Sequence, residues 1–233
     1  MKQLRLFALL ALIPLAASAQ EIVTAEQYFN QVSERYGQVE DYACSISVGT
    51  GKKSMKGELI FKSPSFLRID FRDPADQVIA YDGQTLTVYI PELRAVLSQT
   101  ASEKPASAPS GGAAGGASLA SREGLKMMKR SYTVAYETSP APEPLEAGSQ
   151  ETAVVLVLNR RTVAEGYKTI KLYVSPETKL IRRIRGWTLA GDEIVFDFLG
   201  IKTNLGIPAS RFVYDSPASA NVYNNFLFKS DNP

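Results

Sequence analysis

The sequence predicts a mainly β protein, with about eleven antiparallel strands and a few short helices. Apolar and polar residues alternate along much of the chain, which is the pattern of strands with one buried face. Turn residues separate these segments, most clearly at Asp82-Gly83, a pair that supplies the positive φ of a tight hairpin. Several segments, among them 57–71, are apolar on both faces, so the sheet needs a cover on each side.

The expected strands follow one another through nearly the whole chain. They are 42–48, two strands between 55 and 71, the two halves of a hairpin over 77–90, and then 94–99, 131–138, 151–159, 167–174, 179–189, 192–200 and 210–215. A curved sheet of this kind can form a barrel that is filled by its own side chains, or one that is left partly hollow for an apolar ligand. The strand pattern leaves both forms open.

Two helices are expected. Thr24 and Gln27 form a capping box, and an apolar stripe at helical spacing follows until Gly37. A second helix is predicted over 121–132, and its apolar residues are Leu125, Met127 and Met128. Methionine suits a surface that repacks around varied ligands, and it also fills gaps in ordinary cores.

The first 19 residues have the pattern of a secretory signal peptide. Lys2 and Arg5 precede an apolar run, and Ala17-Ser18-Ala19 is a cleavage site of small residues. An uncleaved signal anchor is the alternative, whereas a lipid-anchored signal would need a cysteine after the apolar run. Cleavage after Ala19 leaves a mature chain of residues 20–233, which we expect to be exported.

The mature chain is expected to be neutral and to form a single domain. Loss of Lys2 and Arg5 leaves 26 − 2 = 24 Lys and Arg against 24 Asp and Glu. A neutral chain lacks the basic charge expected of a nucleic-acid-binding protein. Residues 20–233 suit one β-rich domain. The segment 100–120 is rich in Ala, Ser, Gly and Pro, which predicts a flexible low-complexity loop. A linker between two domains is the alternative for this loop.

The absence of histidine excludes several kinds of enzyme. Without it, no Ser-His-Asp or Cys-His nucleophile and no imidazole metal site is possible. Cys44 is the only cysteine, so no intrachain disulfide can form. Carboxylates are plentiful but scattered, and no pair stands out as an acid and a base. We therefore expect a binding protein without a metal or cofactor, and not an enzyme.

Basic residues are concentrated late in the chain. They are Arg160, Arg161, Lys168, Lys171, Lys179, Arg182, Arg183 and Arg185. Within the same segment only Glu165 and Glu177 are acidic. This predicts either a basic edge that meets anionic headgroups or an acidic partner, or a solvated face that protects the edge of the sheet.

Two stretches in the first half carry an ordered pattern: "GELIFKSPSFLRIDFRDP" and "IAYDGQTLTVYIPEL". Its residues are Gly57, Leu59, Lys62, Pro64, Leu67, Arg68, Asp82, Gly83, Leu86, Tyr89 and Pro91. This pattern resembles that of the outer-membrane lipoprotein carrier proteins of the LolA type. The tail "DFLGIKTNLGIPASRFVYDSP" is similar more loosely, and the likeness spans most of 22–217 with a gap at the low-complexity loop.

The resemblance implies an unclosed antiparallel β-barrel whose short helices form a lid over an apolar cavity. It also implies a periplasmic carrier, a chaperone for lipid chains, that binds lipoprotein acyl chains and shuttles them from the inner to the outer membrane. The implied partners are acylated lipoproteins or lipid, an inner-membrane lipoprotein-releasing transporter and an outer-membrane acceptor. We expect a monomer that binds no nucleic acid.

The strand spacing and the resemblance together predict the residues of the site. The cavity lining is predicted as Tyr42, Cys44, Ile46, Val48, Leu59, Phe61, Leu67, Ile69 and Phe71. The lid and gate are predicted as Ser63, Arg68, Leu125, Met127 and Met128. The family often has Arg where this chain has Ser63, and a hydroxyl donates one hydrogen bond where a guanidinium offers five, so we expect a looser lid. For Arg68 the alternative is a solvent-facing arginine paired with Asp70 or Glu58.

The second half has a weaker resemblance of its own, carried by "GLKMMKRSYTV" and "YKTIKLYVSPETKLIRRIRGW". These stretches are similar to the lipoprotein-binding domain of RseB/MucB-type regulators. The alternative function is therefore a periplasmic lipid or lipoprotein sensor of envelope stress, although this chain is too short for the further domain of those regulators. A filled barrel with a structural role in the envelope is a third interpretation.

Overall fold

A computed structural model describes residues 23–51, 53–100, 118–162 and 166–225. The predicted signal peptide over 1–19 lies outside the described residues, as does nearly all of the predicted loop over 100–120. Both stay predictions, and so does the assignment of residues 20–233 to a single domain.

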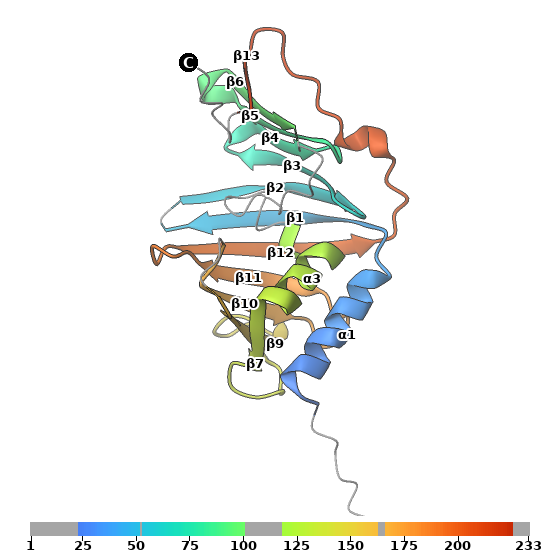
Figure 1. Cartoon of the computed structure of the whole chain (residues 1–233), viewed down its shortest axis with the longest axis vertical. Coiled ribbons are helices and arrows are strands. Elements are labelled where there is room, and N and C mark those ends of the chain that lie inside the picture. The colour runs from blue at the N-terminus through green and yellow to red at the C-terminus, as the bar shows by residue number, and fades with distance from the viewer. Residues whose placement is uncertain (1–22, 52, 101–117, 163–165, 226–233) are drawn as a thin grey trace, which may run out of the picture.

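Thirteen strands form one sheet in the described part of the chain (Figure 1). They are β1 (Asp41–Thr50), β2 (Lys53–Lys62), β3 (Phe66–Asp73), β4 (Ala75–Tyr81), β5 (Thr85–Ile90), β6 (Ala95–Thr100), β7 (Tyr132–Tyr136), β8 (Glu143–Pro144), β9 (Thr152–Arg160), β10 (Thr169–Val174), β11 (Ile181–Trp187), β12 (Glu193–Thr203) and β13 (Asn221–Asn224). The path through the sheet is β13-β6-β5-β4-β3-β2-β1-β12-β11-β10-β9-β7, with β8 paired to β9 beside it. The sheet is unclosed, because the path ends at β13 on one side and at β7 on the other.

The predicted fold class, a mainly β unclosed barrel with short helices, is confirmed. The prediction missed the short strands β8 and β13, and β13 runs parallel to β6 in an otherwise antiparallel succession. The prediction of a strand over 210–215 is wrong. A 3-10 helix, η2 (Ala209–Phe212), and an extended segment take its place, because Phe212 is buried against the ring of Phe66 instead of joining a ladder.

The two predicted helices are present as α1 (Ala25–Gly37) and α3 (Arg122–Ser131), and a 3-10 turn, η1 (Pro91–Leu93), joins β5 to β6. The capping box of α1 is formed as predicted. The N–H of Gln27 donates to Thr24 Oγ1 at 3.2 Å, and the N–H of Thr24 donates to Gln27 Oε1 at 2.7 Å. These reciprocal bonds fix the point where α1 begins.

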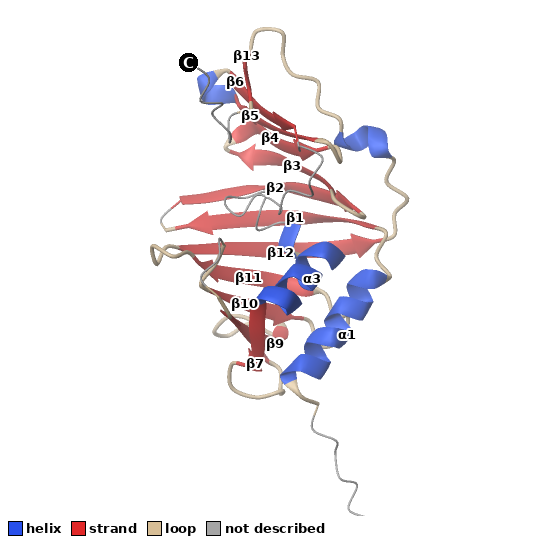
Figure 2. Cartoon of the chain, viewed as in Figure 1, coloured by secondary structure: helices blue, strands red, loops and turns tan. Residues whose placement is uncertain are grey.

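Helices α1 and α3 lie together on one side of the sheet, in front of β7 and β9–β12 in the view of Figures 1 and 2. We call this side the inner face and the opposite side the outer face. Buried residues of both helices and of the inner face belong to a single hydrophobic cluster. The helices are therefore part of the same core as the strands that they cover.

The outer face has a different cover at the other end of the sheet. The segment after β12, residues 204–217, crosses β3 and β5, and we call it the strap. Phe212 lies on Phe66 with ring centroids 5.5 Å apart, and Tyr214 stacks on Tyr89 at 6.0 Å. Phe66 and Tyr89 belong to the outer face, because side chains alternate along each strand.

Candidate functional site

The nine residues predicted to line a cavity lie on β1, β2 and β3 and share the inner face. Each is at most 4% exposed, and all belong to one hydrophobic cluster. Cross-strand register arranges them in rows: Tyr42 lies opposite Phe61, and Phe61 lies opposite Leu67. The rings of Tyr42 and Phe61 stack at 5.2 Å. The structure brings the whole set together, and its role in binding lipid stays a prediction.

Gly57 continues this face between Ile46 and Phe71. A Cβ atom on Gly57 would lie 2.4 Å from the carbonyl oxygen of Asp70, so the close approach of β2 and β3 leaves room for glycine alone. The register between the two strands shifts at this point. The glycine of the family-like pattern therefore has a packing role in this sheet.

The apolar inner face extends beyond the predicted set onto β9, β10, β11 and β12. Its residues there include Leu156, Leu158, Ile170, Leu172, Ile184, Phe196 and Phe198, each at most 1% exposed. For the residues of β9 and β12 the sequence contained a signal, since 152–159 and 193–200 are apolar on both faces. Nothing in those two segments distinguishes the inner face from the outer one, so sequence analysis could not select the right residues.

Helices α1 and α3 cover the inner face as a lid. Of the predicted lid residues of α3, Leu125 and Met128 are fully buried in the shared cluster, and Met127 is half-buried against it. The buried residues of α1 are Tyr28, Phe29, Val32 and Tyr36. In this conformation the lid side chains occupy the inner face.

Among the hollows on the surface of the described residues, two lie away from the contact between lid and sheet. One, of about 380 Å³, lies along the exposed side of α1 and is lined by Gln27, Asn30 and Glu34 among others. The other, of about 410 Å³, lies beside the strap, where Tyr89 and Tyr214 line it. Neither of these two hollows lies between the lid and the inner face.

Tyr42 joins the sheet to the segment that leads into α3. Its hydroxyl donates a buried hydrogen bond to the carbonyl oxygen of Ala120 at 3.0 Å. Burial raises the pKa of Tyr42 well above its ordinary value, and Tyr36 and Cys44 add to the effect, so the hydroxyl keeps its proton and stays a donor. Sequence analysis placed Tyr42 among the apolar residues only, because nothing near it marks Ala120 as its partner.

Two further hydrogen bonds hold the ends of α1. The hydroxyl of Tyr136 donates to the carbonyl oxygen of Val23 at 2.9 Å, just before the helix begins. Near the other end, the N–H of Ile181 donates to the hydroxyl oxygen of Tyr36 at 3.2 Å. Tyrosine hydroxyl groups therefore connect both lid helices to strands of the sheet.

Two buried tyrosine hydroxyl groups have no hydrogen-bond partner among the described residues, those of Tyr28 and Tyr167. Both residues belong to the cluster that includes the lid and the inner face. Burial, the main cause, raises the pKa of each to about 12, so both hydroxyl groups are protonated at neutral pH. Leaving such a group unsatisfied costs about 1–3 kcal/mol, which a carbonyl group of a bound molecule could recover.

Ser63 lies in the turn between β2 and β3. Its N–H donates to the carbonyl oxygen of Glu40 at 2.8 Å, in the connection between α1 and β1. Ser63 is thus next to the C-terminal end of α1. The role of Ser63 at the gate stays a prediction.

The prediction that Arg68 belongs to the lid or gate does not agree with its position. Alternation along β3 turns Arg68 to the outer face, where its Nη1 donates to the carbonyl oxygens of Arg211 at 3.2 Å and Val213 at 3.1 Å. It also forms an ion pair with Asp70 at 2.9 Å and lies 5.8 Å from the ring centroid of Tyr214. Arg68 therefore holds the strap, and the alternative prediction of a pair with Asp70 is confirmed.

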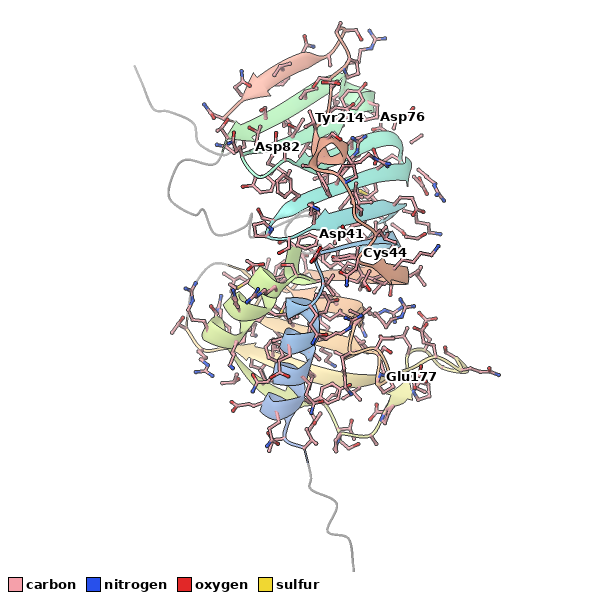
Figure 3. All side chains as sticks on the ribbon, turned by 90° about the vertical axis from the view of Figure 1, so that its right-hand side faces the viewer. Asp41, Cys44, Asp76, Asp82, Glu177 and Tyr214 are labelled. Carbon is pink, nitrogen blue, oxygen red and sulfur yellow. The ribbon has the colours of Figure 1, made fainter. Side chains whose placement is uncertain are left out.

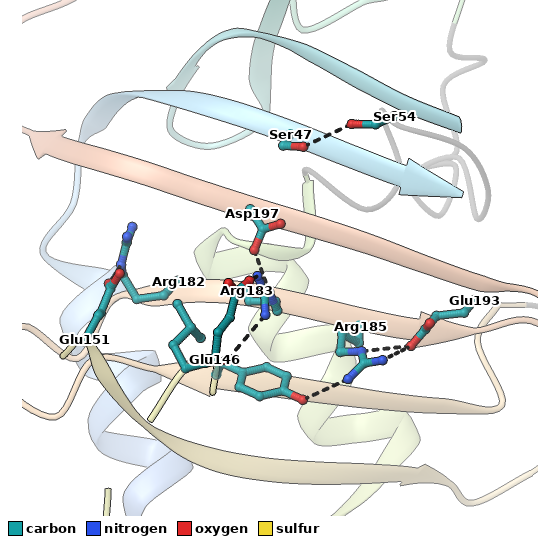
Figure 4. A network of polar contacts seen from close by, with 11 residues as sticks. Ser47, Ser54, Glu146, Glu151, Arg182, Arg183, Arg185, Glu193 and Asp197 are labelled. Carbon is teal, nitrogen blue, oxygen red and sulfur yellow. Dashed lines mark hydrogen bonds and ion pairs between the residues drawn. The ribbon is translucent and has the colours of Figure 1, made fainter. Parts of the chain in front are cut away.

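The basic residues of β10 and β11 are paired with carboxylates from neighbouring segments, and Figure 4 shows the arginines of β11 with their partners. The pairs are Lys171–Glu137, Arg182–Glu151, Arg183–Glu146, Arg183–Asp197 and Arg185–Glu193. Sequence analysis missed these acids because they lie outside the basic segment. These residues lie on interior strands of the sheet path and are neutralised locally, so the interpretation as a solvated face that protects the edge of the sheet does not hold for them.

The described residues contain no group of three or more His, Cys, Asp or Glu side chains that could hold a metal ion. In the same part of the chain, none of the helices combines the length and the hydrophobicity needed to cross a bilayer.

The comparison with curated proteins gives no match. Among solved structures, an uncharacterized conserved protein from Thermus thermophilus is similar, with a TM-score of 0.53 and 10% identity over 86% of this chain and 98% of that chain. The MucB structure in complex with MucA from Pseudomonas aeruginosa has a TM-score of 0.49 and 16% identity, over 85% of this chain and 63% of that chain. A LolA superfamily protein from Nitrosomonas europaea has a TM-score of 0.42 and 14% identity, over 82% of this chain and 98% of that chain.

The family model described as outer membrane lipoprotein carrier protein LolA matches residues 44–114. The matched segment contains the whole pattern from Gly57 to Pro91 on which the resemblance was based. It also contains β2 and β3, which carry five of the nine predicted inner-face residues. Over this segment the chain therefore resembles the outer membrane lipoprotein carrier family LolA, as its sequence predicted.

Proposed function

We propose that this protein is a periplasmic carrier that binds the acyl chains of lipoproteins on its inner face and shuttles them from the inner to the outer membrane. The observation that carries the proposal is the inner face itself, an apolar surface across β1–β3 and β9–β12 that is covered by two helices. The LolA match over 44–114 supports the same function. The signal-like residues 1–19 support export of one domain, residues 20–233.

The free energy of acyl-chain burial explains why both a carrier and a lid are useful. Burying one CH₂ group is worth about 0.8 kcal/mol, so a chain of about 16 carbons represents about 12 kcal/mol. A permanently open pocket that matched this whole surface would bind the chain too tightly to release it. Here Leu125 and Met128 already occupy the inner face, so the lid competes with the acyl chain and favours its release.

Opening of the lid exposes polar groups as well as apolar surface. The bond from Tyr42 to Ala120 has to break, which frees a hydroxyl donor on the inner face. Tyr28 and Tyr167 have hydroxyl groups without partners among the described residues. These donors suit the ester and amide carbonyl groups of an acylated cysteine, and they give a bound chain a preferred depth.

The free energy of acyl-chain burial also means that the carrier needs partner proteins at both membranes. An acyl chain that leaves one protein for water loses its burial, so transfer has to proceed directly between binding sites. We infer an inner-membrane lipoprotein-releasing transporter as the donor and an outer-membrane acceptor, and a monomer is sufficient for this cycle.

Lipid analysis tests the binding function. Protein purified from the periplasm is expected to carry acylated molecules that mass spectrometry detects. Phe61→Glu, on the inner face, should abolish this binding, whereas Ile60→Glu, one residue away and directed to the opposite face, should not. Circular dichroism of both variants checks that strand content is kept. A parent protein without bound acyl groups would support a filled structural barrel instead.

A release assay tests the transport function. Inner-membrane vesicles that carry a lipoprotein and its releasing transporter are incubated with the purified protein, and soluble lipoprotein is measured. A carrier releases it in a complex, and adds it to outer-membrane vesicles. Binding of lipid without release would overturn the carrier function and leave the sensor as the better explanation.

A further inference from the structure

The exposed side of α3 carries a row of basic residues. Arg122, Lys126, Lys129 and Arg130 are all exposed. At 3.6 residues per turn they fall within an arc of about 100° and span about 12 Å along the helix. The opposite side of α3 is buried against the sheet, so the row is directed to solvent.

Strand ends beside the C-terminus of α3 extend this row. The N–H of Arg161 donates to the carbonyl oxygen of Ser131, the last residue of α3, at 3.0 Å. The N–H of Arg160 donates to the carbonyl oxygen of Lys168 at 3.2 Å, and the side chains of Arg161 and Lys168 are exposed. We call the combined surface the lid patch: Arg122, Lys126, Lys129, Arg130, Arg161 and Lys168.

The lid patch differs in its partners from the basic residues of β10 and β11. Within the described residues, Arg122, Arg130 and Lys168 form no ion pair, and Lys126 pairs with Glu123 of its own helix at 3.4 Å. The basic residues in Figure 4, by contrast, are each held by a carboxylate. Positive charge that is not neutralised locally is therefore gathered on the lid and the adjoining strand ends.

We propose that the lid patch binds an anionic lipid surface and places α3 against the membrane. A protein partner normally buries an aromatic or apolar core within its interface, and the lid patch offers none. The exposed large apolar residues of the described chain lie elsewhere: Leu93, Leu189, Leu199, Leu205, Val213, Val222 and Tyr223. Long Lys and Arg side chains without an apolar centre suit the phosphate groups of lipids, through contacts that salt weakens.

The position of the lid patch links membrane contact to the lid. The helix that carries the basic row on one side presents Leu125 and Met128 to the inner face on the other. Attraction between the row and headgroups therefore acts on the element that has to move before an acyl chain can bind. Contact with the membrane needs no bound acyl chain, so the inference extends the proposed function without depending on it.

Vesicle sedimentation tests the inference. The mature chain is mixed with phosphatidylcholine vesicles, with or without phosphatidylglycerol, at low and high salt. We expect binding only to the anionic vesicles, and loss of binding at high salt. The triple variant Arg122→Gln, Arg130→Gln, Lys168→Gln should bind at least about tenfold more weakly, because each basic residue near an anionic surface contributes about fivefold.

A matched control has the same change in charge at another place. Lys53→Gln, Lys56→Gln, Lys202→Gln removes three exposed basic residues of β2 and β12 and should bind anionic vesicles like the parent. Both triple variants should keep co-purifying acyl lipid, which separates this test from that of the proposed function. Equal weakening by the two triple variants would overturn the inference. Binding of the parent to polyglutamate but not to anionic vesicles would also overturn the inference. It would indicate that the lid patch binds an acidic protein instead.

Discussion

The two covers of the sheet, the strap on the outer face and the lid on the inner face, are held by different interactions. The strap begins at a buried carboxylate: Asp41, 1% exposed, accepts hydrogen bonds from the N–H groups of Leu205 at 2.6 Å and Ile207 at 2.8 Å. Farther along, Arg68 donates to two strap carbonyl groups, and Tyr214 stacks on the outer face. Asp41 and Tyr214 are both labelled in Figure 3, near the start and the end of the strap.

The lid is held mainly by apolar contact. Leu125 and Met128 supply the buried side of α3, and the described hydrogen bond from the strands to the start of this helix is that of Tyr42 to Ala120. Apolar contacts have no fixed direction and can be exchanged for those of a lipid chain, whereas a buried carboxylate needs its particular N–H partners. The comparison predicts that the strap is a permanent part of the fold and that the lid is the part that separates.

The largest effect is expected from Asp41→Ala. The substitution leaves the strap N–H groups of Leu205 and Ile207, whose hydrogen bonds are partly buried, without their charged acceptor, so the free energy of unfolding should fall by about 3 kcal/mol. Urea denaturation followed by circular dichroism measures this change. Asp215→Ala, at an exposed position of the same strap, should stay within about 0.5 kcal/mol of the parent. Equal values for the two variants would show that Asp41 does not anchor the strap.

Tyr42→Phe is expected to act on the lid with a smaller change in stability. It removes the bond to Ala120 and keeps the ring that stacks on Phe61. One buried hydrogen bond is worth about 1 kcal/mol, so the open lid should become about fivefold more populated. Stopped-flow uptake of a fluorescent fatty acid should become faster by a similar factor.

Tyr81→Phe is the matched control for the lid. The Tyr81 hydroxyl donates to the carbonyl oxygen of Gly83 at 3.0 Å in a hairpin that no lid helix covers. Loss of this hydrogen bond should lower the free energy of unfolding by a similar amount, about 1 kcal/mol, without changing the rate of fatty-acid uptake. Faster uptake in both variants would mean that general loosening, and not the lid, limits the rate.

Much of the fold was predictable from short-range patterns. The alternation over 42–48 predicted β1, the Asp82-Gly83 turn predicted the hairpin of β4 and β5, and the pair Thr24 and Gln27 predicted the start of α1. Each of these depends on residues within a few positions of one another. Alternation also placed the nine inner-face residues together, because two-residue spacing determines which side chains share a face.

The parts that sequence analysis missed depend on distant partners. The strap residues 210–215 alternate like a strand, and only the presence of Phe66 and Tyr89 on the outer face explains why they lie across the sheet instead of within it. Tyr42 is in a strand pattern, but the carbonyl group that it bonds is 78 residues away. Arg68 was assigned to the lid from the resemblance, although alternation along β3 directs it to the strap.

Cys44 offers a native probe of the lid. It is 4% exposed on the inner face, and burial, the main cause, raises its pKa to about 12, so the thiol stays protonated at pH 8. Since the raised pKa favours the protonated folded form, the stability from this group is complete below the ordinary pKa and is lost as the pH rises toward 12. Alkylation at pH 8 should therefore be slow in the parent and faster, by up to about fivefold, in Tyr42→Phe.

The rate of Cys44 alkylation also separates opening of the lid from general loosening of the protein. Tyr81→Phe, which loosens a hairpin away from the helices, should leave the rate close to that of the parent at concentrations of urea too low to unfold the protein. Mass spectrometry of the intact chain follows the reaction. Equal rates in Tyr42→Phe and Tyr81→Phe would show that Cys44 becomes exposed by global unfolding and not by opening of the lid.

The smallest effect is expected from Ser63→Arg. Ser63 stands where the family often has an arginine that holds the lid, and its N–H bonds to Glu40 beside the end of α1. An added guanidinium supplies five donors near the lid, so fatty-acid uptake should become slower. The effect should be below about twofold in the parent, because Tyr42 already bonds the segment before α3. The slowing of uptake should be larger in the Tyr42→Phe background, because the bond from Tyr42 to Ala120 is missing there and the added arginine can compensate for it. A double-mutant cycle of uptake rates measures this coupling, and rates that are unchanged by Ser63→Arg in both backgrounds would show that this position does not act on the lid.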